Sequence, residues 1–245
     1  MQTSTAVMET STARRTQGAK DEQFRRLRPF LAPQVLKLIL TSSDEELLRF
    51  RQRDITVVFC DLRGFTAFVY TAPPAAIIDV LGAYHRSIGP VIVDSNGILE
   101  RFTGDGLMVY FDDASLDDQA WRAVRMAVGM RDLVEDLSTE WRQRGHHLSL
   151  GIGIALGEAT LGPIGFDQRR DYAAIGPVTN LASRLCAEAT AGQVLVSERL
   201  YASVRDIVEA EPLGPRALKG LEAPVEVYSV RAVKRGALES VGARG

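Results

Sequence analysis

The sequence predicts an α+β domain, and three observations lead to that prediction. Residues 54–61 ("DITVVFCD") form a short β-branched run bounded by charged residues, which is typical of a buried strand. Residues 74–93 and 115–144 repeat apolar side chains at helical spacing. The segments "GILERF" and "LMVYF" flank "TGDG", which predicts a β-hairpin closed by a tight Asp-Gly turn.

The rest of the chain continues the alternation of strands and helices. These later elements are expected as strands at 148–157, 170–175, 193–197 and 224–230 and as helices at 177–190 and 197–204. The strand at 148–157 is thinned by glycines. The resulting order β-α-β-β-α-β, followed by further α and β elements, predicts a ferredoxin-like core, in which an antiparallel sheet carries helices on one face.

The length of 245 residues suits one folded domain with extensions or two small domains. Residues 1–21 are rich in Ser, Thr, Ala and Arg without periodicity, so we expect them to be disordered. Residues 22–53 show a helical pattern interrupted by two prolines, which predicts a short helical segment for regulation or dimerisation. A membrane-surface helix is a weaker alternative there, because acidic residues dilute its basic face. The main domain is placed at 54–231, and 232–245 is expected to be a flexible tail.

Composition limits the cellular setting and the class of partner. Hydrophobic residues make up 46% of the chain and the net charge is −2, so no strong field attracts nucleic acid. No apolar run approaches the roughly 20 residues of a membrane helix, and the start of the chain lacks the apolar core of a signal peptide. Cys60 and Cys186 lie in apolar stretches and are interpreted as buried thiols of a reducing compartment. We therefore expect a cytoplasmic location without a transmembrane segment.

Two carboxylates fall at positions where they could meet. Asp61 ends the first predicted strand, and Asp105 lies at the tip of the hairpin. In a ferredoxin-like sheet the first strand is central and lies beside this hairpin, so both carboxylates reach one end of the sheet. Two such groups repel unless a proton or a cation lies between them, and Mg²⁺ binds one or two carboxylates together with substrate phosphates. The alternative is that Asp61 caps a helix and Asp105 is an ordinary turn residue.

A second polar pair lies on the helix predicted at 177–190. Asn180 and Arg184 are four residues apart and therefore share one helix face. Beside a metal-phosphate site, the arginine could stabilise charge that develops in phosphoryl transfer, and the asparagine could bond a ribose oxygen. The alternative is a structural salt bridge and an inter-helix hydrogen bond.

Three segments, "FCDLRGFT", "RFTGDGLMVYF" and "GPVTNLASRL", resemble the class III nucleotidyl cyclases in their order and spacing. The resemblance extends over residues 54–230. It implies the catalytic-domain fold of that family and a head-to-tail homodimer with active sites at the interface. It also implies two Mg²⁺ or Mn²⁺ ions per site, which we assign to Asp61, Leu62 and Asp105.

The resemblance further implies roles for the nucleotide-binding residues. Asn180 would orient the ribose and Arg184 would stabilise the transition state, both from the opposite subunit. The segment "LKGL" makes Lys219 the candidate contact to the triphosphate. The remaining nucleotide contacts expected here are Gly64, Phe65, Thr66 and Gly104, of which the first three form a glycine-containing turn that could offer backbone N–H groups to a phosphate.

The implied reaction is the cyclisation of a nucleoside triphosphate in intracellular cyclic nucleotide signalling. One ion lowers the pKa of the ribose 3′-hydroxyl for attack on the α-phosphorus, the second holds the triphosphate, and pyrophosphate leaves in line. A diguanylate cyclase or polymerase palm would share the core and the two-metal logic, but the first needs a Gly-Gly-Asp/Glu-Glu-Phe hairpin, and this hairpin reads "TGDGLM".

The base-reading positions depart from the family pattern. Arg101 stands where adenylyl cyclases usually have lysine and guanylyl cyclases glutamate, and Ala173 stands where a polar side chain is usual. Arginine only donates hydrogen bonds, so it can donate to adenine N1 or guanine O6 but cannot accept from guanine N1–H, which favours ATP. Strand alternation is expected to point the adjacent Glu100 to the other face. The prediction is an adenylate cyclase with loose base selectivity; a guanylate or dual-purine cyclase and a silent nucleotide-binding module are the alternatives.

Overall fold

The computed structural model describes residues 22, 23 and 25–234, so the predicted disordered segment at 1–21 and most of the predicted tail lie outside the described residues. The chain divides into two units, Met1–Leu47 and Leu48–Gly245. The described residues of the first unit include η1 (Arg28–Phe30), a 3₁₀ helix, and the helices α2 (Pro33–Thr41) and α3 (Asp44–Leu47). A proline stands in the first turn of both η1 and α2, which explains the short elements of this predicted helical segment.

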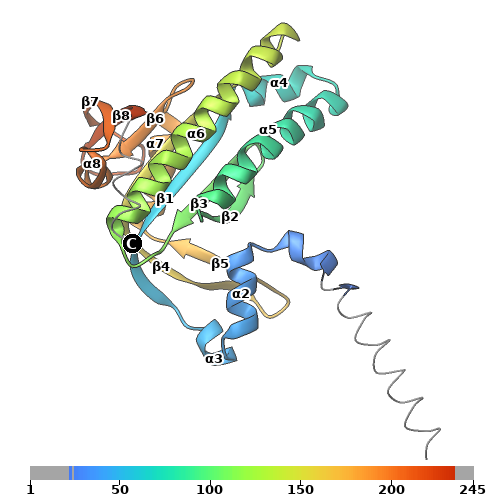
Figure 1. The fold of residues 1–245 in the computed structure, drawn as a ribbon, viewed down its shortest axis with the longest axis vertical. Helices are drawn as coiled ribbons and strands as arrows, with labels where there is room; N and C mark the ends of the chain where they lie inside the picture. The colour runs from blue at the N-terminus through green and yellow to red at the C-terminus, as the bar shows by residue number, and fades with distance from the viewer. Residues whose placement is uncertain (1–21, 24, 235–245) are drawn as a thin grey trace, which may run out of the picture. The chain divides into compact units, whose positions relative to one another are not determined.

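The second unit alternates strands and helices along one continuous sheet (Figure 1). Its strands are β1 (Arg51–Arg63), β2 (Ile98–Thr103), β3 (Gly106–Phe111), β4 (Ser149–Phe166), β5 (Arg169–Ile175), β6 (Val194–Ser197), β7 (Val208–Arg216) and β8 (Val225–Val233). Its helices are α4 (Phe65–Thr71), α5 (Pro74–Asp94), α6 (Leu116–Gln143), α7 (Pro177–Glu188) and α8 (Glu198–Val204).

The strand order confirms the predicted topology where it matters for the site. The sheet runs β2-β3-β1-β4-β6-β8-β7, and β5 pairs with the far end of β4. β1 therefore lies between the β2–β3 hairpin and β4, as a ferredoxin-like core requires. All pairs are antiparallel except β4 with β6, which is parallel.

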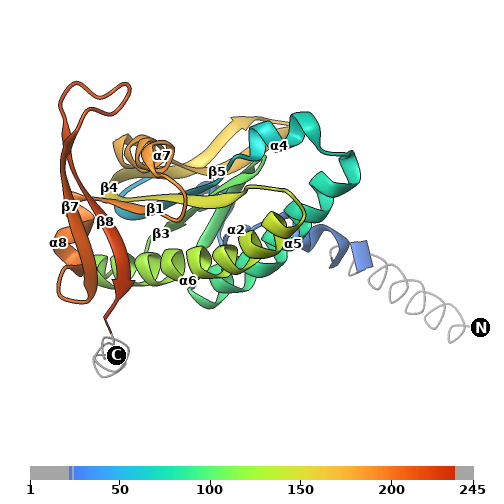
Figure 2. The same ribbon diagram turned by 90° about the horizontal axis from the view of Figure 1, so that it is seen from above.

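The predicted placement of helices on one face holds for the core helices α5 and α6 but not for α7. Figure 2 shows α5 and α6 on one side of the sheet and α7 on the other. The cause is that β1 has apolar side chains on both faces: Val58 and Cys60 join the cluster that includes α5 and α6, whereas Ile55 and Val57 join the cluster that includes α7. Asp61 lies on the same face of β1 as Ile55 and Val57, the face toward α7, because alternate residues of a strand share a face.

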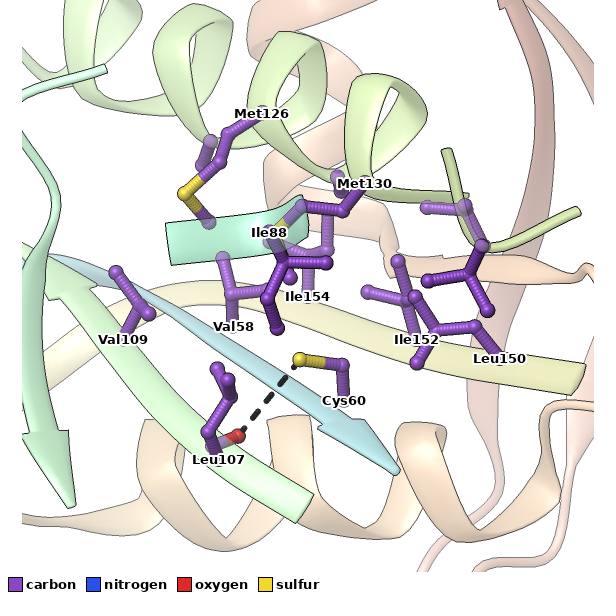
Figure 3. Close-up of a cluster of buried hydrophobic side chains, with 14 of the residues drawn as sticks. Val58, Cys60, Ile88, Leu107, Val109, Met126, Met130, Leu150, Ile152 and Ile154 are labelled. Atoms are coloured by element: carbon purple, nitrogen blue, oxygen red, sulfur yellow. Dashed lines mark hydrogen bonds between the residues drawn. The ribbon is translucent and has the colours of Figure 1, made fainter. Parts of the chain in front are cut away.

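The larger cluster forms the main hydrophobic core, between the sheet and the helices α5, α6 and α8 (Figure 3). Cys60 lies inside it with its Sγ 4.0 Å from the carbonyl oxygen of Leu107. Both cysteines are buried free thiols, as predicted. Burial first of all raises the pKa of Cys186 to about 11, so this thiol stays protonated at neutral pH.

Helix α5 corrects one further expectation. By length and composition it is the one helix of the described residues that could cross a membrane, so the prediction that no apolar run reaches that length is wrong. One face of α5, which includes Tyr84 and Ile88, is buried in the main core.

β1 and β4 extend furthest beyond their predicted bounds, and one strand was missed. β1 begins at Arg51, inside the segment expected to be helical, and β4 continues to Phe166. β7 was not predicted, because Pro212, Gly214 and Pro215 interrupt its sequence. The sheet order makes β7 an edge strand, where prolines are tolerated because one side of the strand has no partner.

Candidate active site

The structure brings Asp61 and Asp105 together at one end of the sheet. Asp61 lies near the end of β1, and Asp105 lies in the turn between β2 and β3, the strand that pairs with β1. A Cβ placed on Gly106 would lie 3.0 Å from Asp61 Oδ1 and 2.9 Å from the Cys60 carbonyl oxygen. The absence of a side chain at Gly106 therefore lets the hairpin turn approach the end of β1.

The two carboxylates interact electrostatically. Burial, and next to it the negative charge of Asp61, raises the pKa of Asp105 to about 6. The backbone N–H groups of Asp105 and Leu62 bond the Asp105 carboxylate and lower its pKa. The raised pKa of Asp105 indicates that a cation beside the two carboxylates is more favourable than a second negative charge.

The donor set fits a hard divalent cation. Carboxylate oxygens are the protein ligands that Mg²⁺ prefers, and Mg²⁺ keeps positions for water and substrate phosphates. In the described part of the chain, no cluster of three or more His, Cys, Asp or Glu side chains could hold a metal by itself. The pair Asp61 and Asp105 is therefore suited to a cation that shares its ligands with a phosphate-bearing substrate. The side chain of Leu62 is buried in the core, so only its backbone could take part in such a site.

Asn180 and Arg184 lie on the exposed face of α7, as the spacing predicts. The opposite face, which includes Ala182 and Leu185, is buried against the sheet. Among the described residues, no hydrogen bond or ion pair of either polar side chain is formed. The alternative of a structural salt bridge within the chain therefore has no support, and neither side chain is linked to Asp61 or Asp105.

The other predicted nucleotide contacts differ in what they expose: some are exposed residues, and others could offer only their backbone. Gly64 has φ +84°, and a Cβ there would lie 2.5 Å from the His147 carbonyl oxygen, so glycine is required where β1 turns into α4. Gly104, in the hairpin turn, and Thr66 are exposed. Phe65 points its ring into the core and offers only its backbone. Lys219 is exposed in the loop between β7 and β8.

Glu100 does not point away from Arg101 as strand alternation predicted. Leu99 pairs with Val109 and Arg101 with Met108, which leaves Glu100 without a partner in a β-bulge. The Arg101 guanidinium donates to Glu100 from Nε at 2.5 Å and from Nη2 at 2.8 Å. The Glu100 side chain is only 3% exposed, against 51% for Arg101.

This pair lies close to β5. The Glu100 carboxylate, and more weakly that of Asp171 on β5, raises the pKa of Arg101. β2 contacts β5, where Ala173 is buried and offers no polar group. The bulge thus places the Glu100 carboxylate, a hydrogen-bond acceptor, beside Arg101, where the sequence analysis expected only the donor groups of the arginine.

Arg63 is a further polar residue that the sequence analysis did not single out. It follows Asp61 by two residues on β1 and donates from Nη1 to Asp61 Oδ2 at 3.0 Å. The spacing of two on a strand was a usable signal, because it places both side chains on one face. Arg63 therefore contacts a predicted metal-site carboxylate directly.

Comparisons with known proteins agree with the resemblance seen in the motifs. A family model described as the adenylate and guanylate cyclase catalytic domain matches residues 49–232. An adenylate cyclase of Anabaena cylindrica is 29% identical over 189 residues, which cover 74% of this chain and 37% of that enzyme. Adenylate cyclase 1 of Rhizobium meliloti is 27% identical over 188 residues, which cover 75% of this chain and 28% of that enzyme. The chain thus spans about a third of the length of these relatives.

Solved structures include both purine specificities. The adenylyl cyclase CyaB from P. aeruginosa has a TM-score of 0.74 and 34% identity, covering 77% of this chain and 98% of that one. The guanylyl cyclase Cya2 has a TM-score of 0.68 and 31% identity, covering 76% and 96% respectively. With a family match over most of its length, two facing carboxylates and the cyclase fold, this chain belongs to the class III nucleotidyl cyclases, the adenylate and guanylate cyclase catalytic domain family.

Proposed function

We propose that this protein is an adenylate cyclase, which converts ATP to 3′,5′-cyclic AMP and pyrophosphate at the interface of a homodimer. The observation that supports this most is that, within the described chain, neither Asn180 nor Arg184 forms a hydrogen bond or ion pair with Asp61 or Asp105. Asp61 and Asp105 face each other at the end of the sheet, whereas Asn180 and Arg184 are exposed on α7 without partners in the described chain. A second copy would bring the halves together.

A twofold dimer suits this arrangement. In an isologous pair, a patch on one subunit meets the corresponding patch of the other, so two identical sites form. Each site would take its carboxylates from one subunit and its asparagine and arginine from the other. Two divalent cations, Mg²⁺ or Mn²⁺, are proposed for each site.

The roles of the residues follow from their chemistry. When bound, the divalent cations would supply positive charge that favours loss of the 3′-hydroxyl proton and departure of pyrophosphate. Asp61 and Asp105 would hold them, and Asn180 would orient the ribose so that its 3′-oxygen lies in line with the α-phosphorus. Arg184 would donate to α-phosphate oxygens as the new P–O bond forms and the bond to the β-phosphate breaks. Lys219 would bind the triphosphate, which suits its exposed position.

The first test measures product formation by the purified protein. With Mn²⁺ and ATP we expect cyclic AMP and pyrophosphate in equal amounts, because no other co-reactant is needed. The Asp105→Ala variant should form neither above background, since it loses half of the carboxylate pair. A folded dimeric protein that forms no cyclic nucleotide from ATP or GTP would contradict the proposed function and favour a silent nucleotide-binding module.

Base choice rests on the Glu100–Arg101 pair, and this pair keeps a dual-purine cyclase as the second candidate. Two of the three Arg101 nitrogens bind Glu100, which leaves Nη1 to donate to adenine N1 or guanine O6. The Glu100 carboxylate is the acceptor that guanine N1–H requires, but the guanidinium occupies it. ATP is therefore favoured as long as the pair stays closed.

Opening the pair should shift the substrate preference. In Arg101→Ala, we expect the ratio of kcat/KM for ATP to that for GTP to fall about tenfold, because a donor is lost and a carboxylate acceptor is freed, each hydrogen bond contributing about 1–3 kcal/mol. Steady-state rates with each nucleotide measure this ratio. The control is Arg101→Ala combined with Glu100→Ala, which should not gain GTP use. An unchanged ratio in the single variant would show that Glu100 does not read the base.

A further inference from the structure

The side chain of Arg63 joins Asp61 to the C-terminal end of α7. Besides the bond from Nη1 to Asp61 Oδ2, its Nε donates to the Ala189 carbonyl oxygen at 2.8 Å, and its Nη2 donates to the Cys186 carbonyl oxygen. All three guanidinium nitrogens are therefore engaged. Cys186 lies in the last turn of α7 and Ala189 is its C-cap, where arginine side chains can bond the last carbonyl groups of a helix. The Cys186 carbonyl also accepts from the Ala189 N–H at 3.1 Å, so the guanidinium is its second donor.

The guanidinium occupies space that is open because residue 151 is a glycine. A Cβ on Gly151 of β4 would lie 2.5 Å from Arg63 Nε and 2.6 Å from Nη2, so any larger residue would displace the group. The Arg63 side chain is only 25% exposed. The planar Arg63 guanidinium is fixed by three hydrogen-bond partners. It therefore sets the orientation of the Asp61 carboxylate rather than moving with it.

Helix α7, which holds two of the three guanidinium nitrogens, is packed tightly on the sheet. Its backbone lies directly on β4 at Gly153, where an added Cβ would be 2.0 Å from the Cys186 nitrogen. Ala182 and Leu185 are fully buried beside this contact. The end of α7 also carries the negative pole of the helix, which offsets part of the guanidinium charge.

Within the proposed function, on which this inference rests, we propose that Arg63 is a positioning residue for the metal-binding half of the site. Its guanidinium holds Oδ2 of Asp61 against α7, so Oδ1 stays directed to the hairpin turn at Gly106, beside Asp105. The carboxylate thus keeps one oxygen free for a cation before any cation or nucleotide binds. The sequence motif assigns no role to this arginine.

A competing account predicts that loss of Arg63 strengthens cation binding instead of weakening it. A guanidinium beside the site repels a cation and competes for the same carboxylate, so its removal would strengthen cation binding. Positioning predicts the reverse, because outer-shell partners that orient a ligand typically contribute tenfold or more to metal affinity. The direction of the change in affinity therefore decides between the two accounts.

The test is a titration of the full chain with Mn²⁺, with free Mn²⁺ measured by electron paramagnetic resonance and no nucleotide present. For Arg63→Met we expect a dissociation constant about tenfold higher than for the wild type. The matched control is Arg122→Met: Arg122 likewise joins a helix C-cap, through the Ser95 carbonyl oxygen at 3.0 Å, to carboxylates, here those of Asp118 and Asp113. In thermal unfolding, Arg122→Met should lose about as much stability as Arg63→Met, but its Mn²⁺ affinity should equal that of the wild type.

Arg63→Lys separates geometry from charge. Lysine keeps the charge but cannot reach two carbonyl oxygens and a carboxylate at once, so only a small part of the affinity should return. Unchanged or tighter Mn²⁺ binding by Arg63→Met, or full recovery in Arg63→Lys, would overturn the positioning role alone. A wild-type protein that binds no Mn²⁺ without nucleotide would also overturn the positioning role alone, because Asp61 would then hold no oxygen ready for a cation. Mn²⁺ binding that persists in Asp105→Ala would instead overturn the proposed metal site and with it the proposed function.

Discussion

Asp105→Ala and Arg184→Ala are each expected to abolish cyclase activity, and a mixture of the two chains is expected to regain it. Loss of a carboxylate that holds the divalent cation should cost about 4 kcal/mol in the transition state, or about a thousandfold in rate. Loss of the arginine should lower the rate about as much, because such arginines typically contribute a thousandfold or more. Both residues would be needed in every site, but they would come from different subunits.

The size of the recovery is set by symmetry. When the two variants are co-expressed in equal amounts, half of the dimers are mixed, and each mixed dimer has one site with both groups intact and one with neither. The expected activity is therefore about a quarter of the wild-type value. Product formation by the co-purified mixture measures it, and each variant expressed alone is the control. If the mixture stayed inactive although mixed dimers form, the two halves would belong to one chain and the proposed interface site would be wrong.

Gly153→Ala is expected to have the largest effect on stability. The added Cβ would lie 2.0 Å from the Cys186 nitrogen and 2.4 Å from the Ala182 carbonyl oxygen, and both are backbone atoms of α7. The helix has to move away from the sheet, which opens the contact between β4 and α7. We expect the free energy of unfolding to fall by about 3 kcal/mol, at the upper end for an overpacked core. Urea-induced unfolding followed by circular dichroism measures it.

Gly129→Ala provides the matched control, because it makes the same change inside α6. There the added Cβ would lie 3.6 Å from Val91 Cγ1, an ordinary contact, and alanine favours helix over glycine by about 0.5–1 kcal/mol. This variant should be as stable as the wild type or more so. A loss below about 1 kcal/mol in Gly153→Ala would show that α7 does not lie on β4 as closely as described.

Local sequence patterns were sufficient for most elements of the domain. The Asp-Gly turn between two apolar strands predicted β2 and β3, and the helical periodicity of 74–93 and 115–144 predicted α5 and α6. These signals are local, since turn chemistry and the spacing of apolar residues act within a few residues. β7 lacked such a signal, because its edge position tolerates prolines that would normally argue against a strand.

The candidate site was predictable to the extent that its residues lie in motifs. Spacing placed Asn180 and Arg184 on one face of α7, and the ferredoxin-like order placed Asp61 beside Asp105. The error at Glu100 has a specific cause: strand alternation holds only while the register is unbroken, and a bulge depends on the partner strand as well as on the bulged one.

The sequence by itself determined the family, the order of strands and helices apart from β7, and the residue types that suit nucleotide cyclisation. Only the tertiary structure decided that α7 covers the face opposite α5 and α6, that Glu100 holds Arg101, and that Arg63 ties Asp61 to the end of α7. The reason is physical. Each of these contacts depends on how closely segments distant in the sequence approach, or on strand register, and the glycines that permit two of them, Gly151 and Gly153, read locally only as a weakened strand.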